Sequence, residues 1–281
     1  MFDKSDLNEY LRRQVFVAFD TETTGLWAPV NRVVEIGAVR FELEVEGGRS
    51  FESLINPERT MPLDVIRVHG ITDQMVAEAP LAADILKQFK EFCGSDTVLI
   101  AHNAPFDISF LGMEFSRAGI SYPENIIVDT VDILHRTVPG LPSYSLEALA
   151  RRFRFAQVQE HRALADALLV AALFRLAAPG LEGIGKKEDW GRNLAAYRMA
   201  EWHDDSIRLP EEFAALDRAV RLNQRITIVY EARPNAPQRR TIQPRRIHRL
   251  RNAYYIEGWC EKARADRTFR LDRITRYTLE E

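Results

Sequence analysis

The sequence has few of the features that mark secreted, membrane or metal-thiolate proteins. It contains two cysteines, Cys93 and Cys260, and neither has a Cys or His at metal-site spacing, which argues against a disulfide framework and a zinc site. The longest uninterrupted apolar run, residues 167–174, is far shorter than a membrane span, and the first ten residues lack the apolar core of a signal peptide. We therefore expect a cytoplasmic protein with reduced thiols and no membrane partner.

Internal repeats and low-complexity tracts are also lacking. Hydrophobic residues make up 46% of the 281 residues and charged residues 28%, which is ordinary for a globular protein, and a chain of this length usually forms two domains. The charge is uneven: residues 207–281 carry a net charge of +7 and the preceding residues −10. The basic part can attract an anionic partner, or its charges can simply form a solvated face.

Short runs rich in β-branched and aromatic residues predict buried strands in the first part of the chain. These strands are expected at 15–20, 33–42, 52–55, 97–101 and 126–128. Helices are expected at 105–115, 145–152 and 162–177, with further helical packing between 72 and 92.

Glycine and mixed charges over residues 179–206 indicate an interdomain linker. Beyond it, an amphipathic helix is expected at 209–223 and short strands at 226–230, 241–248, 253–259 and 268–271. Several short strands separated by turns rich in Pro, Asn and Arg favour a small β-barrel or sandwich.

The end of the first predicted strand carries two carboxylates. Asp20 and Glu22 are two residues apart, so their side chains project from the same face of the strand. Two like charges placed so closely cost free energy unless a cation neutralises them, and hard oxygen ligands suit Mg²⁺ or Mn²⁺. A solvated strand end is the alternative interpretation.

Two later segments hold further polar groups. Asp107 enters the first turn of a helix after a buried strand, where sites gather in α/β sheets, although a carboxylate there also interacts favourably with the helix dipole. His161 and Asp166 are five residues apart, which is about 140° on a helix, so the two cannot share a helical face. We expect His161 on the loop before the helix, as a general base or as a capping residue.

Taken together, these segments resemble a known family. FDTETTG, HNAPFD and HRALADA, in this order, are similar to the three exonuclease motifs of the DEDDh group, which includes DnaQ-like proofreading subunits and RNase T. The resemblance covers about residues 14–178 and includes INPERTMP, VHGIT and SLEAL. It implies an α/β fold of the ribonuclease H-like kind, with a mixed five-stranded sheet flanked by helices.

The resemblance also implies a site and a reaction. It assigns two divalent cations, Mg²⁺ or Mn²⁺, to Asp20, Glu22, Asp107 and Asp166, and the role of general base to His161. The expected reaction is 3′-to-5′ hydrolysis of DNA or RNA, with single-stranded ends favoured and nucleoside 5′-monophosphates released. Substrate contacts are implied at Thr23, Thr24, Leu26 and Asn103. His69, His102 and His135 are expected to be structural.

The basic C-terminal part resembles the WYL domain family through ITIVY, TIQPRRI, AYYIEGWC and RTFRLDRI. The triplet that names the family is Tyr254-Tyr255-Ile256 here, which departs from Trp-Tyr-Leu at its first and third positions. The resemblance implies a small SH3- or Sm-like β-barrel that binds nucleic acid or a nucleotide-like ligand. Guanidinium groups that suit phosphates are expected at Arg245, Arg246, Arg270 and Arg273.

Three functional hypotheses remain at this point. The first is an exonuclease with a catalytic domain at 1–178, a linker at 179–206 and a WYL domain at 207–281. The second is a nucleic-acid or nucleotide sensor in which the nuclease fold mainly binds. The third is a polymerase proofreading subunit, which needs a partner-binding surface that no segment identifies. The complete set of four carboxylates and one histidine favours the enzyme.

Overall fold

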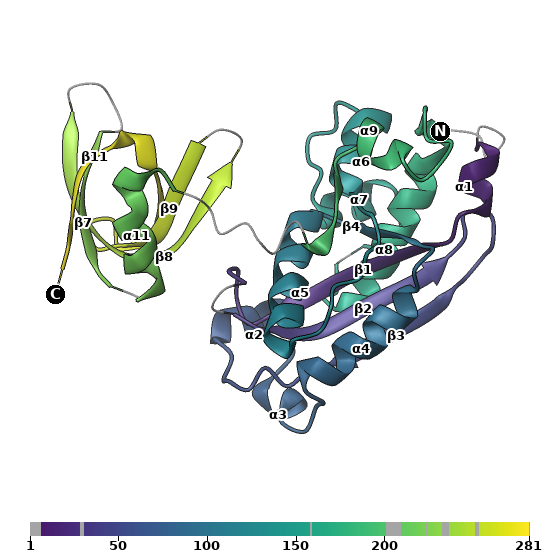
Figure 1. Ribbon diagram of the computed structural model, residues 1–281, viewed down its shortest axis with the longest axis horizontal. Helices are drawn as coiled ribbons and strands as arrows, with labels where there is room; N and C mark the ends of the chain where they lie inside the picture. The colour runs from purple at the N-terminus through teal and green to yellow at the C-terminus, as the bar shows by residue number, and fades with distance from the viewer. Residues whose placement is uncertain are drawn as a thin grey trace. The chain divides into compact units, whose positions relative to one another are not determined.

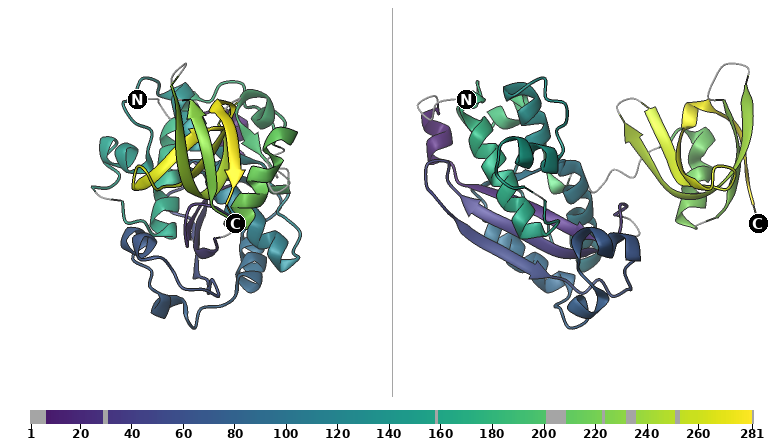
Figure 2. Two further views of the ribbon diagram at one scale, coloured as in Figure 1. Left: turned by 90° about the vertical axis from the view of Figure 1, so that its left-hand side faces the viewer. Right: turned by 180° about the vertical axis from the view of Figure 1, so that it is seen from behind.

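Two units make up the chain, Met1–Asp204 and Asp205–Glu281. The computed structural model describes residues 7–28, 31–157, 159–200, 209–222, 224–231, 236–250 and 253–280. Figure 1 and Figure 2 show that the first unit is a sheet with helices on both faces, and that the second is a curved sheet accompanied by a short helix.

The first unit is built around a six-stranded mixed sheet in the order β3-β2-β1-β4-β5-β6. Its strands are β1 (Phe16–Thr23), β2 (Val33–Phe41), β3 (Arg49–Leu54), β4 (Val98–Ala101), β5 (Ile127–Asp129) and β6 (Ala196–Tyr197). β1, β2 and β3 are antiparallel neighbours, β4 and β5 run parallel to β1, and β6 is antiparallel to β5. The mixed sheet of five strands predicted from the sequence is present, and the two-residue β6 extends it.

Helices cover both faces of this sheet because β1 sends apolar side chains alternately to each. They are α1 (Glu9–Arg13), α2 (Leu63–His69), α3 (Asp73–Val76), α4 (Ala82–Cys93), α5 (Ala104–Ala118), α6 (Thr130–Thr137), α7 (Leu146–Arg152), α8 (Ala163–Ala177), the 3-10 turn η2 (Ala178–Gly180) and α9 (Asp189–Asn193). Phe16 and Ala18 belong to the core under α8, whereas Val17 and Phe19 belong to the core that includes α4 and α5. Although α8 with η2 is long and apolar enough to cross a membrane, it packs against β1 and β2 as a core helix.

The segment predicted as a linker at 179–206 is part of the first unit as far as it is described. Trp190 of α9 is fully buried, its ring meets that of Phe16 edge-on with centroids 6.2 Å apart, and its Nε1 donates to Tyr10 Oη at 3.1 Å. Met199 is buried in the core on the opposite face of the sheet. The expected boundary at residue 178 is therefore corrected: glycines and charges dominate this segment, but its few apolar residues complete the core.

The second unit is an antiparallel sheet in the order β10-β9-β8-β7-β11, placed where the small barrel was expected. Its elements are η3 (Glu211–Phe213), α11 (Ala214–Arg221), β7 (Ile226–Glu231), β8 (Pro237–Leu250), β9 (Ala253–Cys260), β10 (Ala265–Arg270), η4 (Leu271–Arg273) and β11 (Ile274–Leu279). Ile228, Ile242 and Ile256, one from each central strand, are fully buried. β11 was not predicted, because its sequence ITRYTL is half polar.

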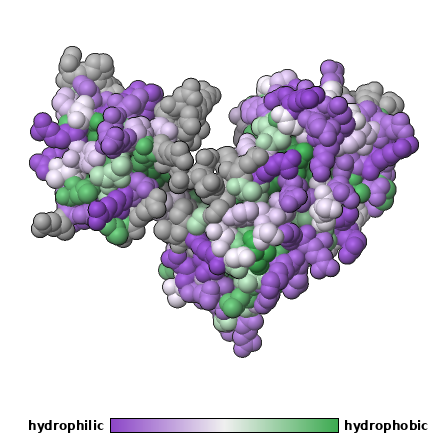
Figure 3. Space-filling model, viewed as in Figure 1, coloured by the Kyte–Doolittle hydropathy of each residue, from purple (hydrophilic) through white to green (hydrophobic). Residues whose placement is uncertain are grey.

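The surface of the molecule is described by its exposed residues. Figure 3 shows mainly hydrophilic residues on the visible face, with small apolar areas between them. Large apolar side chains that are exposed in the first unit include Leu63 and Val68 of α2 and Met75 of α3. Single exposed apolar residues of this kind are normal on globular proteins.

Candidate active site

Three carboxylates meet between β1 and α8. Asp20 and Glu22 lie on the row of β1 side chains that faces α8, and Asp166 lies in the first turn of that helix. One carboxylate oxygen from each of the three lies within 4.8 Å of the others. Asp166 Oδ2 accepts a hydrogen bond from Gln159 Nε2 at 2.5 Å, while its buried Oδ1 has no partner among the described residues. A buried carboxylate oxygen without a hydrogen-bond partner costs free energy, which a bound cation would offset.

Asp107 approaches the same region from the other face of β1. It is buried in the first turn of α5, and its Oδ1 accepts a hydrogen bond from Thr21 Oγ1 at 2.7 Å. Thr21 follows Asp20 in the chain and so points to the opposite face of the strand. Asp107 lies outside the group within 4.8 Å, yet close enough for its charge to raise the pKa of Asp20. The structure therefore brings together all four predicted carboxylates, three of them in close proximity.

The carboxyl groups resist ionisation because they are crowded and shielded from water. Burial, followed by the charges of Asp107 and Asp166, raises the pKa of Asp20 well above its usual range. Burial and the charge of Asp166 raise the pKa of Glu22 to about 9. Burial raises the pKa of Asp107 to about 7, against the hydrogen bond from Thr21. Crowded carboxylate oxygens of this kind fit Mg²⁺ or Mn²⁺, which prefer hard oxygen ligands.

His161 lies on the loop before α8, beside the carboxylates and off the helix. Its backbone φ of 50° is in the left-handed region, which is uncommon for a residue other than glycine. The residues around it are held: Gln159 donates to Asp166, and Arg162 forms a bidentate ion pair with Glu35. Burial raises the pKa of Asp166, and the hydrogen bond from Gln159 and the proximity of the half-buried His161 oppose this rise. The loop therefore places His161 next to the acidic cluster, which is where the sequence predicts the general base.

The predicted substrate contacts divide into buried and exposed residues. Thr23 Oγ1 donates to Gly25 O at 2.6 Å, and the fully buried Thr24 accepts a hydrogen bond from the backbone of Arg32 at 3.0 Å. Both hydroxyls are therefore engaged within the turn that follows β1. Leu26 is 69% exposed, and Asn103 is exposed as the N-cap residue of α5 with a φ of 61°. These two side chains are accessible to a bound substrate.

Three further histidines of this unit, His69, His102 and His135, have structural contacts, as the sequence predicts. Both ring nitrogens of His102 lie 2.8 Å from an oxygen, Thr130 Oγ1 for Nδ1 and Tyr144 O for Nε2, and burial lowers the pKa of the ring to about 4. His69 is buried, and its Nδ1 accepts a hydrogen bond from Ile71 N at 3.0 Å. His135 stacks on Tyr144 with ring centroids 3.7 Å apart.

Comparison with known proteins agrees with this geometry. The family model described as exonuclease, of the RNase T type, matches residues 17–174. The chain belongs to the exonuclease family. Its first unit is an exonuclease domain of the DnaQ-like kind, and a WYL domain model matches residues 211–279 of the second unit.

Relatives of known name include polymerase components. The DNA polymerase III subunit epsilon of Rickettsia felis is 42% identical over 180 residues, which are 62% of this chain and 78% of that protein. The PolC-type DNA polymerase III of Oceanobacillus iheyensis is 34% identical over 220 residues, which are 75% of this chain. The chain spans 15% of the length of that polymerase.

Solved structures share the fold at low identity. The nuclease domain of 3′hExo, a DEDDh family member bound to rAMP, superposes with a TM-score of 0.53 and 16% identity over 58% of this chain and 90% of that one. Exonuclease I superposes with a TM-score of 0.52 and 18% identity over 88% of this chain and 55% of that one. The exonuclease domain thus has the architecture of known exonucleases.

The arginines predicted as ligand contacts of the WYL domain differ in their surroundings. Arg245 of β8 and Arg273 of η4 are exposed. In Arg270, by contrast, Nε donates to Asp272 Oδ1 at 2.8 Å and Nη2 donates to Asp272 Oδ2 at 2.7 Å. The side chain of Arg246 lies outside the described residues. Arg270 is therefore partly neutralised by Asp272.

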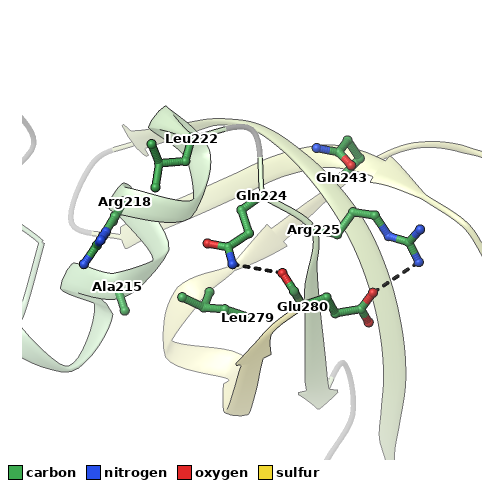
Figure 4. Close-up of a pocket in the computed structure, with 8 residues that line it drawn as sticks. All are labelled: Ala215, Arg218, Leu222, Gln224, Arg225, Gln243, Leu279 and Glu280. Carbon is green, nitrogen blue, oxygen red and sulfur yellow. Dashed lines mark hydrogen bonds and ion pairs between the residues drawn. The ribbon is translucent and has the colours of Figure 1, made fainter.

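A cavity of about 690 Å³ lies between α11, the start of β7, the middle of β8 and the end of β11 (Figure 4). Its lining residues are Ala215, Arg218, Leu222, Gln224, Arg225, Gln243, Leu279 and Glu280. Within it, Gln224 Nε2 donates to Glu280 O at 2.9 Å, and Arg225 pairs with the Glu280 carboxylate at 3.1 Å. The sequence did not predict this cavity, because its lining residues come from both ends of the domain sequence, from Ala215 to Glu280.

Proposed function

We propose that the protein is a metal-dependent 3′-to-5′ exonuclease that releases nucleoside 5′-monophosphates from DNA or RNA, with single-stranded ends favoured. The observation that carries this proposal is the convergence of Asp20, Glu22 and Asp166 within 4.8 Å, with His161 beside them. Crowded carboxylates destabilise a fold unless a cation neutralises them, so their presence indicates a role in cation binding. The 3′ polarity is supported by the name of the similar 3′hExo nuclease domain.

The proposed mechanism assigns a role to each group. The residues that would hold two cations, Mg²⁺ or Mn²⁺, are Asp20, Glu22, Asp107 and Asp166. Bound there, the cations would lower the pKa of the attacking water and stabilise charge on the entering and leaving oxygens. His161 accepts the proton of that water as general base. Thr21 and Gln159 fix the carboxylates of Asp107 and Asp166 by hydrogen bonds, which orders the ligand set before substrate binds.

Substrate binding is assigned to the exposed groups around this cluster. Leu26 presents an apolar side chain that can pack on the terminal base, and Asn103 can contact the scissile phosphate. We assign the substrate contacts of Thr23 and Thr24 to their backbone groups, because both hydroxyls already form hydrogen bonds in the turn.

Degradation of end-labelled strands tests the proposal. Single-stranded DNA and RNA labelled at the 5′ or the 3′ end are incubated with Mg²⁺, Mn²⁺ or EDTA. We expect 5′-labelled strands to give a ladder that requires metal, and His161→Ala to lower the rate by about 10²–10⁴-fold. His135→Ala, a change at an exposed histidine that stacks on Tyr144, is the matched control and should retain the rate. Binding without cleavage by the wild type would favour the sensor hypothesis instead.

A proofreading role is the second candidate, favoured by the similarity to 78% of the epsilon subunit of Rickettsia felis. Proofreading requires preferential removal of a mispaired terminal nucleotide. Excision rates are therefore compared on duplexes that differ in one terminal base pair. Faster excision of the mispaired end supports the role, and equal rates remove it.

The WYL domain is assigned to an anionic partner, either the substrate strand or a nucleotide-like ligand. Residues 207–281 carry a net charge of +7, and Arg245 and Arg273 are exposed. Because the preceding residues carry −10, the basic domain supplies a net positive charge for phosphates that the acidic part of the chain lacks.

A further inference from the structure

One buried carboxylate near the site belongs to neither the cation ligands nor the general base. Glu35 is the acidic residue of β2, an otherwise mostly apolar strand, and its side chain is 0% exposed. It lies directly opposite Glu22 in the β1–β2 register, so both side chains point to the α8 face of the sheet. A buried carboxylate requires partners that satisfy its oxygens.

Those partners come from the start of α8. Arg162 Nε donates to the two oxygens of Glu35 at 3.0 and 3.1 Å, and Arg162 Nη2 donates to Oε1 at 2.5 Å. Glu35 Oε2 also accepts from the backbone N–H of Ala163, the first residue of α8, at 2.8 Å. Arg162 is the N-cap residue but makes no side-chain cap bond. Glu35 therefore caps α8 from a neighbouring strand, and its charge also suits the helix dipole.

Gly37 fixes the same turn of α8 by close contact. It lies two residues after Glu35, on the same face of β2, and opposite Asp20 in the register. A Cβ at Gly37 would lie 2.1 Å from Ala163 C and Leu164 N, so the helix backbone rests directly on this glycine. The first turn of α8 is thus held at two points of one strand.

His161 immediately precedes this anchored turn and has a strained left-handed backbone, which persists only where its surroundings hold it. We infer that Glu35, through its ion pair with Arg162, is a positioning residue that holds His161 against the carboxylate cluster. This inference rests on the proposed function for its catalytic consequence. The claim that the Glu35–Arg162 ion pair fixes the position of His161 can be tested without measuring activity.

Two variants weaken the contact in different ways. Glu35→Gln removes the charge but keeps one oxygen as an acceptor, and Arg162→Lys keeps the charge but loses the bidentate fork. Each should lower kcat by about 10–100-fold with KM unchanged, which is the usual effect of removing a group that orients a catalytic residue. The control is Glu52→Gln, because Glu52 is a second, 44% exposed carboxylate 3.7 Å from Arg162 Nη2. It should leave kcat unchanged.

Combination with His161→Ala separates positioning from other roles. If Glu35 acts through His161, adding Glu35→Gln to His161→Ala causes no further loss of rate, because the positioned group is already absent. A further loss as large as the one that Glu35→Gln causes alone would overturn the inference, as would wild-type kcat in both Glu35→Gln and Arg162→Lys.

A spectroscopic measurement on the full chain distinguishes failure of this inference from failure of the proposed function. The ring resonances of His161, assigned by their loss in His161→Ala, are compared in the folded variants. They should shift in Glu35→Gln and Arg162→Lys and remain in place in Glu52→Gln. If the wild type proves inactive, a shift still supports the positioning contact, whereas unchanged resonances in both variants overturn it. If Glu35→Gln fails to fold, Arg162→Lys decides alone.

Discussion

Replacing Asp166 by Asn should stabilise the protein when no divalent cation is present. The substitution removes one charge from a cluster whose carboxylate oxygens lie within 4.8 Å of one another. The Asn side chain keeps an oxygen that can accept the hydrogen bond from Gln159, so little else is lost. The reason for the gain is that the metal-free fold carries repulsion which the unfolded chain does not.

The magnitude follows from Coulomb's law. With an effective dielectric constant of about 20, two unit charges 4.8 Å apart repel each other by about 3.5 kcal/mol. The raised pKa values keep part of the cluster protonated, so we expect a gain of about 2–3 kcal/mol at pH 8. For a unit of this size that gain corresponds to a rise in Tm of about 5–10 °C.

The same argument fixes the direction of the pH dependence. A carboxyl group whose folded pKa exceeds its unfolded pKa keeps its proton in the folded state after the unfolded chain has released it, so stability falls as pH rises between the two values. The window runs from 4.5 to about 9 for Glu22 and from 3.8 to about 7 for Asp107. Wild-type protein in EDTA should therefore lose stability from pH 5 to pH 9, and Asp166→Asn should lose less.

Thermal unfolding followed by circular dichroism, in EDTA and with Mn²⁺, measures both effects. Mn²⁺ at a hundredfold excess over its Kd should stabilise the wild type by about 2.7 kcal/mol and the variant by much less. Two results would refute the reasoning: a variant that melts at or below the wild-type temperature in EDTA at pH 8, or equal stabilisation of both proteins by Mn²⁺.

The remaining predictions concern packing and the second unit. Trp190→Ala should lower the free energy of unfolding by about 3–5 kcal/mol in urea titrations, since the ring is fully buried against Phe16; a loss below 1 kcal/mol would mean that the segment after residue 178 is dispensable. Gly37→Ala should lower the free energy of unfolding by about 1–3 kcal/mol, and it should also lower exonuclease activity because the added Cβ displaces α8. Gly191→Ala is the control: nothing described lies within 4 Å of its added Cβ, so it should change neither quantity. Deleting residues 207–281 should weaken single-strand binding and flatten its dependence on salt, measured by fluorescence anisotropy; an unchanged salt slope would show that the WYL domain does not contact phosphates.

Much of the site could be predicted from the sequence because it depends on local chain geometry. The period of two along a strand places Asp20 and Glu22 on one face, and the 100° step of a helix separates His161 from Asp166. The structure has both arrangements. The buried strands were equally predictable. In a run such as VFVAFD, apolar side chains point to both faces of the strand, and they are removed from water only when both faces of the sheet are covered.

Other features depend on contacts between residues far apart in the chain, which no local pattern encodes. Glu35 and Arg162 are 127 residues apart, and in sequence they are merely one acid in a strand and one base before a helix. The need for glycine at position 37 arises only because α8 rests on that point of β2. Trp190 likewise completes the core between the sheet and α8, although the composition of its segment predicts a linker. The sequence by itself determined which carboxylates and which histidine are the candidates for the chemistry. The tertiary structure decided what holds them in place, because that support comes from elements that meet only after the chain has folded.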